Sequence, residues 1–245
     1  MKKFATLAFV IACLAPAGPA LAAGPSGGLD RANIDLTDTA SVQRGAEYFF
    51  QYCIGCHSLE HARYNRIGQD LGLTNEQVEE MFIHTRDASG DPTGVGELIK
   101  IAMRPDDAEE WFAQPAPDLT LTARANSPDW IYTVLRNFYL DDSRPLGVNN
   151  ATFEAMGMPH VLWELQGWQK NVGEDGEIKL ELVEEGKMSA EEYDEVVRDI
   201  TAFMTYVAEP IRMEREAMGM YVIWFLIVFT ILAYLLKKEY WRDVH

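Results

Sequence analysis

The segment QYCIGCHSLE, residues 51–60, places the strongest constraint on the fold of this 245-residue chain. Two cysteines stand three apart and a histidine follows the second. Three kinds of chemistry use such groups: a redox-active dithiol, part of a zinc site, or covalent attachment of haem. Zinc usually takes four ligands from several Cys and His residues, and a thioredoxin-type dithiol begins a helix after a strand. Here only one Cys pair exists, with the histidine adjoining it, which does not suit zinc. A helical stripe of Val42, Ala46, Phe49 and Phe50 leads into the motif, which does not suit a dithiol.

The C-x-x-C-H spacing is instead the pattern of c-type haem attachment. Cys53 and Cys56, three apart on a helical turn, can reach both vinyl groups at one edge of a porphyrin. His57 then lies over the ring, where an imidazole nitrogen can bind the iron. The sequence therefore predicts one covalently attached haem c, held by Cys53 and Cys56, with His57 as an axial ligand.

The chain begins with a segment typical of a secretory signal peptide, MKKFATLAFVIACLAPAGPALA, residues 1–22. A basic start precedes an apolar run that is too short to span a bilayer, and Ala20-Leu21-Ala22 is a small-x-small cleavage site. The alternative is a lipoprotein signal with Cys13 lipidated. It is disfavoured because a better cleavage site lies nine residues later. Cleavage removes two lysines and no acid, so the net charge changes from −17 to −19 (19 basic against 38 acidic residues).

Residues 217–236, AMGMYVIWFLIVFTILAYLL, contain no charged side chain. As a helix they cover roughly 30 Å, the thickness of a bilayer's hydrocarbon core. Basic residues follow the segment, and the positive-inside tendency therefore predicts a cytoplasmic tail in a bacterial inner membrane. The predicted organisation is a signal peptide at 1–22, a periplasmic haem domain at 23–212, a single transmembrane anchor at 213–236 and a cytoplasmic tail at 237–245.

Between these two segments the chain reads as helices joined by long loops. Three helix starts carry capping residues: Thr74 with Gln77, Ser127-Pro128-Asp129, and Ser189 with Glu192. Residues 176–183 alternate apolar and charged side chains after a turn at 173–176, which predicts a small β-hairpin. Residues 86–97 and 113–127 are predicted loops. The predicted fold is mainly α, a loop-rich cytochrome c-type haem domain with a small β-hairpin, plus one C-terminal transmembrane helix.

Sequence spacing alone does not identify the sixth ligand of the predicted haem iron. Electron-transfer cytochromes often place a methionine opposite the histidine, which raises the reduction potential. The turn-like segment EAMGMP, residues 154–159, offers Met158 as the preferred ligand and Met156 as a near rival. His160 is a third candidate, which would give a bis-histidine site of lower potential.

At these motifs the chain resembles the cytochrome c1 family, the haem subunits of ubiquinol–cytochrome c oxidoreductase. The resemblance covers nearly the whole exported domain and the tail. The matching stretches are Arg44-Gly45, CIGCHSL at 53–59 with Arg63-Tyr64-Asn65-Arg66 after it, PAPDLTLTARA at 115–125, AMGMP at 155–159, and VAEP at 207–210 before the single membrane helix. Two departures stand out: the chain lacks cysteines for the extra disulfide of some relatives, and AMGMP is followed by HVLWELQG.

The resemblance implies a role for each matching residue. It implies attachment and proximal ligation by Cys53, Cys56 and His57, with Met158 as the axial methionine. It also implies that Arg124 contacts a haem propionate, as a guanidinium fork suits a carboxylate. Trp130 would stand beside the haem, and Pro117, within the Pro-x-x-Asp stretch at 115–118, would wall the haem crevice.

The resemblance further implies electron transfer from a Rieske iron–sulfur protein to cytochrome c, beside a cytochrome b subunit in a dimeric complex. The chain would be the electron-transfer subunit of that enzyme and would have no catalytic activity of its own.

Residues 171–195 hold ten acidic residues and two lysines. They form either a solvated surface or a docking surface for a basic electron carrier. The acidity argues against nucleic acid. The alternatives are a relay for another oxidase or reductase, and a haem enzyme or gas sensor with an open distal position.

Overall fold

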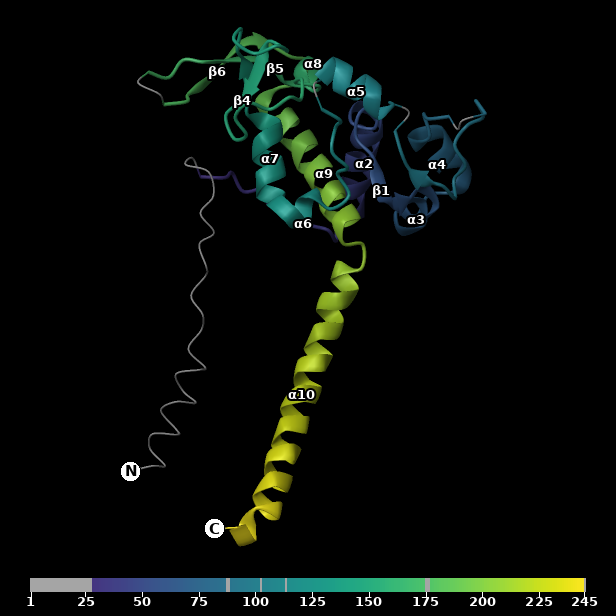
Figure 1. Cartoon of the computed structure of the whole chain (residues 1–245), viewed down its shortest axis with the longest axis vertical. Coiled ribbons are helices and arrows are strands. Elements are labelled where there is room, and N and C mark those ends of the chain that lie inside the picture. Colours follow the sequence, from purple (N-terminus) through teal and green to yellow (C-terminus); the bar gives the residue numbers. More distant parts are fainter. Residues whose placement is uncertain (1–27, 87–88, 102, 113, 175–176, 245) are drawn as a thin grey trace.

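The computed structural model shows a head of helices and small sheets on one long C-terminal helix (Figure 1). It describes residues 28–86, 89–101, 103–112, 114–174 and 177–244, so the predicted signal peptide lies outside the described residues. The predicted mainly helical class is confirmed. The helices of the head are α2 (Thr39–Tyr52), α3 (Tyr64–Asp70), α4 (Asn75–Phe82), α5 (Pro105–Phe112), α6 (Thr122–Asn126), α7 (Pro128–Arg136), α8 (Trp163–Gln166) and α9 (Ala190–Ala208).

Helices α2 and α9 form the central pair of the head (Figure 1). Their backbones approach so closely at Gly45 that a Cβ atom there would lie 1.9 Å from the carbonyl oxygen of Asp199. The Asp199 carboxylate is buried beside this crossing. It accepts hydrogen bonds from Ser41 Oγ at 2.5 Å and from Arg44 Nε and Nη2 at 2.7 and 3.1 Å. The missing side chain at Gly45 and the ion pair between Asp199 and Arg44 therefore fix how α9 packs on α2.

Aromatic side chains pack between α2, α4 and α9. Phe50 of α2 stacks on Phe82 of α4 at 4.6 Å between ring centroids, and Phe49 packs on Phe203 of α9 at 5.4 Å. All four rings are essentially inaccessible to solvent. Burying each side chain contributes about 1.5–3 kcal/mol. The apolar stripe that leads into the motif is thus the core face of α2.

The predicted hairpin forms, but as part of a larger sheet. Strands run in the order β4-β3-β5-β6, with β3 and β5 parallel and the other pairs antiparallel. The predicted strand at 176–183 is β6, which begins at Leu180 and continues to Glu185. The strands are β1 (Leu59–Arg63), β2 (Leu98–Ile99), β3 (Phe138–Leu140), β4 (Val148–Asn150), β5 (Gly167–Asn171) and β6 (Leu180–Glu185), and β1 pairs with β2 in a separate sheet.

All three predicted helix starts are confirmed. The residues at Thr74 and Ser189 form complete capping boxes, and the Ser127 side chain accepts a hydrogen bond from Trp130 N–H. The predicted loop at 113–127 contains the short helix α6, which the Gly- and Pro-free stretch Thr122–Asn126 forms before Ser127 turns the chain with a φ of +89°.

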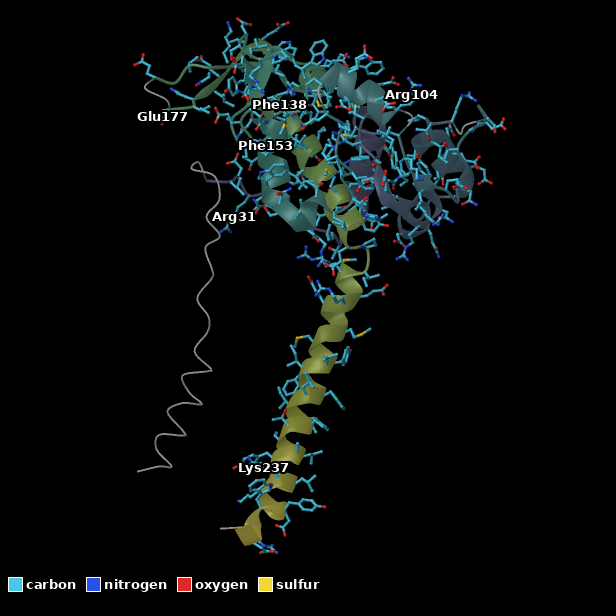
Figure 2. The ribbon with its side chains drawn as sticks, viewed as in Figure 1. Arg31, Arg104, Phe138, Phe153, Glu177 and Lys237 are labelled. Atoms are coloured by element: carbon cyan, nitrogen blue, oxygen red, sulfur yellow. The ribbon has the colours of Figure 1, made fainter. Side chains whose placement is uncertain are left out.

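Helix α10 (Arg212–Tyr240) is the one described helix long and apolar enough to cross a membrane, with a mean hydropathy of 2.3 over its most apolar 18 residues and no buried residue. It extends away from the head, and Lys237 lies near its far end (Figure 2). Glu209 braces the joint between α9 and α10. Its carboxylate accepts from Arg215 Nε of α10 at 2.5 Å and lies 3.2 Å from Arg124 Nη1 of α6.

Candidate functional site

The Cys53–His57 motif closes the C-terminal end of α2. The Cys53 N–H still donates to the helix, to the carbonyl oxygen of Phe49 at 2.8 Å, and the His57 N–H donates to Cys53 O at 2.9 Å. The motif is therefore a further helical turn, which brings both thiols and the imidazole together. The two sulfurs are free thiols, with Cys53 buried and Cys56 half-buried.

The imidazole of His57 is held in one orientation. The ring is buried, and Nδ1 lies 2.8 Å from the carbonyl oxygen of Pro117, so Nδ1–H donates to that carbonyl. Within the described chain Nε2 has no hydrogen-bond partner. Burial lowers the pKa of His57 below its ordinary value, which keeps the ring neutral. A neutral imidazole whose second nitrogen is fixed by a backbone carbonyl is the usual state of a metal-ligating histidine.

The thiols do not resemble those of a redox dithiol. Burial raises the pKa of Cys53 to about 12 and also raises the pKa of Cys56, whereas a reactive dithiol has a lowered pKa. Among the described residues, no group of three or more His, Cys, Asp or Glu side chains is arranged to hold a metal ion, which counts against a zinc site. Two free thiols beside an oriented imidazole fit the attachment of a haem c.

Asp118 braces the segment that orients His57. Its carboxylate accepts hydrogen bonds from Ser58 Oγ at 2.9 Å, Glu60 N–H at 2.7 Å and Thr120 N–H at 3.0 Å. Partial burial acts to raise the pKa of Asp118, but the hydrogen bonds outweigh it and lower that pKa. Asp118 therefore ties the strand after the motif to the segment that carries Pro117.

Replacement of Asp118 by asparagine is expected to lower the free energy of unfolding by about 1–3 kcal/mol, because charged acceptors are lost. A carboxyl whose pKa is lowered by folding stabilises the protein above its unfolded pKa. That contribution is lost as the pH falls below about 4. Chemical denaturation from pH 7 to pH 3 should show a shallower acid loss in Asp118→Asn. Asp142→Asn, at an exposed carboxyl, is the control, and equal acid slopes in all three proteins would contradict this role.

The segment at 114–117 connects His57 with the methionine loop, residues 151–159. Pro117 bonds His57, and a Cβ at Gly157 would lie 3.5 Å from Gln114 Nε2. Met156 and Met158 are both half-buried in this loop. His160 is buried, stacked on Phe138 with 5.0 Å between ring centroids, and its Nε2 has no partner in the part of the chain that is described.

The other predicted site residues lie on α6 and α7. Trp130 is half-buried and packs edge-on against Phe153 at 6.1 Å between ring centroids, and Phe153 is exposed on the head (Figure 2). Arg124 is largely exposed and pairs with Glu209 at the base of the head. Two buried side chains, Asn149 and Asn150, hold the methionine loop but were not predicted. The sequence marks them only as two adjacent asparagines after Val148.

These features define a class of protein: a mainly helical head of the cytochrome c type, with its C-x-x-C-H motif at the end of α2, carried on one apolar helix. A comparison with known families agrees with that description. The chain belongs to the cytochrome c1 family, whose model matches residues 31–244. The family is one of haem-containing electron carriers of cytochrome bc1-type complexes, so membership implies a covalently attached haem c.

Two similar proteins align with the full length of the chain. It is 52% identical over 253 residues to cytochrome c1 of Allochromatium vinosum, with 100% of both chains covered. It is 43% identical over 245 residues to a Nitrosomonas europaea protein named ammonia monooxygenase gamma subunit, covering 100% of this chain and 99% of that one. Cytochrome c1 of Rhodospirillum rubrum is 24% identical over 240 residues, covering 84% and 83%.

Proposed function

We propose that this chain accepts an electron from a Rieske iron–sulfur protein and passes it to cytochrome c within a membrane-bound quinol–cytochrome c oxidoreductase. The observation that carries the proposal is the oriented imidazole of His57, which lies beside two free thiols with its Nδ1–H bonded to Pro117 O. Family membership supports the same conclusion. The chain acts as the electron-transfer subunit and has no catalytic activity of its own.

Each site residue has a distinct task in this proposal. A bound haem c supplies a one-electron iron couple. Cys53 and Cys56 would hold it through thioethers, and His57 Nε2 and the Met158 sulfur would bind its iron. A methionine ligand raises the reduction potential relative to a second histidine. Pro117 fixes the imidazole, and Trp130 would lie against the haem. Arg124, which pairs with Glu209 through Nη1, would offer its other guanidinium N–H groups to a propionate carboxylate.

The partner complex is tested by purification. The relatives carry two different names, cytochrome c1 and ammonia monooxygenase gamma subunit, so the sequence is compatible with service in more than one assembly. Membranes of the native host should be solubilised in mild detergent and the haem-stained band isolated with its companions. Co-purification of a cytochrome b and a Rieske protein in a dimeric complex is the expected result. Recovery with a different oxidoreductase, and without these two, would refute the assignment.

The proposed topology places the head, residues 23–212, in the periplasm and residues 237–245 in the cytoplasm of a bacterial inner membrane. Its support is the signal-like sequence at 1–22 and the 29-residue apolar helix α10 with basic residues at its far end. The acid-rich region at 171–195 includes the tip of the β5–β6 hairpin, where Glu177 lies (Figure 2). Its negative charge suits docking of a basic cytochrome c.

Replacement of Cys53 by serine is expected to remove one of two thioether bonds. The haem stain on a denaturing gel should weaken while attachment through Cys56 persists. In Cys53→Ser/Cys56→Ser all colour should pass into acidified organic solvent. Cys13→Ser is the matched control, because this cysteine lies in the predicted signal peptide, and its haem content should equal that of the wild type. Full haem staining of the double variant would exclude covalent attachment at this motif.

A further inference from the structure

The methionine loop, residues 151–159, contains neither helix nor strand, yet it carries the proposed ligand Met158. A free loop of this length samples many conformations, and each ordered residue costs about 1–2 kcal/mol in backbone entropy, a cost that must be offset by contacts. Three side chains outside the predicted site supply those contacts: Arg144, Asn149 and Asn150.

Asn150 fixes the start of the loop. It ends β4 with a relative exposure of 1%. Its Oδ1 accepts hydrogen bonds from the backbone N–H groups of Thr152 at 2.9 Å and Phe153 at 3.1 Å. Its Nδ2 donates to the carbonyl oxygen of Val134 in α7 at 2.8 Å. One buried amide therefore bonds both the loop and the helix that carries Trp130.

Ala155 is held in a conformation that L-residues rarely adopt, with a φ of +60°. Two side chains clamp its peptide groups. The Ala155 N–H donates to Asn149 Oδ1 at 3.0 Å, and its carbonyl oxygen accepts from Arg144 Nη2 at 3.1 Å. Asn149 is itself buried and donates from Nδ2 to Asp141 Oδ2 at 3.0 Å. Among the described residues, the bond to Ala155 is the one hydrogen bond of the Arg144 guanidinium.

The clamp determines the direction of the chain just before the two methionines. Ala155 immediately precedes Met156-Gly157-Met158, and a left-handed residue reverses the local path of the backbone. Non-glycine residues keep such a φ only where the surroundings over-determine it, and they concentrate at functional sites. Beyond the clamp, Gly157 lies against Gln114, in the segment that leads to Pro117 and His57.

We propose that Asn149, Asn150 and Arg144 are positioning residues that hold the Met158 sulfur where it would bind the haem iron. The inference rests on the proposed ligation by Met158. Among the described residues, no hydrogen bond joins any of the three to the Met158 side chain. They act through the backbone of residues 152–155, and loss of the clamp lets the sulfur leave the iron more often.

The test uses the full-length protein in detergent, with haem attached. Asn149→Ala removes the acceptor of Ala155 N–H, and Arg144→Ala removes the donor to its carbonyl. In both variants we expect carbon monoxide to bind the reduced protein about tenfold faster than in the wild type, a factor that corresponds to about 1.4 kcal/mol. The midpoint potential and the sulfur-to-iron absorption band should both fall. Arg144→Lys, which keeps a donor, should restore most of both signals.

Asn171→Ala is the matched control. This asparagine holds the β5–β6 loop with the same chemistry, since its Oδ1 accepts from the N–H groups of Gly173 and Lys179, both at 3.0 Å. It should leave carbon monoxide binding and potential unchanged. Arg144 is half-exposed, so its variants can be measured even if Asn149→Ala fails to accumulate. Wild-type binding rates and potentials in Arg144→Ala would overturn the inference.

A double variant separates this inference from the proposed function. If the clamp acts through Met158, Arg144→Ala should add nothing to carbon monoxide binding in a Met158→Leu background. An undiminished effect in that background would overturn the positioning role while leaving the ligand assignment intact. An unchanged potential in Met158→Leu itself would instead refute Met158 as the ligand.

Discussion

Replacement of Met158 by leucine is expected to lower the midpoint potential of the haem by more than about 59 mV, a tenfold change in a one-electron equilibrium. Leucine matches methionine in volume but offers no sulfur, so the stabilisation of ferrous iron by the thioether is lost. Haem attachment should persist, because Cys53 and Cys56 are unaffected. A redox titration of the purified protein, with the absorption spectrum recorded at each step, measures both effects.

The same variant should open the sixth position to external ligands. Reduced wild-type protein, with methionine on the iron, should bind carbon monoxide slowly and incompletely at neutral pH, and Met158→Leu should bind it rapidly and stoichiometrically. Met156→Leu is the control two residues away in the same loop. If Met156→Leu lowers the potential and Met158→Leu does not, the near rival is the ligand. Unchanged potentials in both would point to His160, whose Nε2 is buried without a partner. Rapid binding by the wild type would favour a haem enzyme or sensor.

Replacement of Gly45 by alanine is expected to reduce the free energy of unfolding by about 4 kcal/mol or more, a loss reached by few single substitutions. The added Cβ would lie 1.9 Å from Asp199 O and 2.4 Å from Asp199 C. Both atoms belong to the backbone of α9, which cannot rotate away as a side chain would. To make room, α9 must move off α2, which separates Phe49 from Phe203 and pulls the Asp199 carboxylate from Arg44.

Chemical denaturation of the detergent-solubilised protein measures this loss. Gly96→Ala is a suitable control, because a Cβ at Gly96 meets no atom within 4 Å and its φ is not left-handed. The control should unfold within about 0.5 kcal/mol of the wild type, as surface substitutions usually do. Equal stability of the Gly45 and Gly96 variants would mean that the two helices do not pack as closely as described.

Local sequence patterns predicted the helices well. The capping boxes at Thr74 and Ser189 and the Ser127-Pro128 start depend on neighbouring residues, so a linear reading finds them. The parallel pairing of β3 with β5 was not predicted, because it joins short strands whose partners lie some thirty positions away in the sequence. A three-residue strand such as β4 has no period long enough to detect.

Some residues of the candidate site were also predicted from the sequence, whereas others became visible only in the structure. The C-x-x-C-H motif is contiguous and was found at once. The Pro117 carbonyl that orients His57 lies sixty positions away, and backbone carbonyls carry no residue-type signal. Resemblance to the cytochrome c1 family indicated Pro117, whereas the Asn149 and Arg144 clamp on Ala155 became visible only in three dimensions. Spacing alone did not distinguish Met158 from Met156, and resemblance to the cytochrome c1 family favoured Met158; both are half-buried in the structure.

The joint at Glu209 limits how the head can move above the bilayer. Its carboxylate bonds α6 and the first turn of α10 at once, across a connection of three residues between the two helices. These contacts oppose independent tilting of the head on α10, so in the proposed topology the C-x-x-C-H motif keeps nearly the same height over the lipid surface. Under the proposed function, a change in the separation between this subunit and its electron donor would then come mainly from movement of the donor.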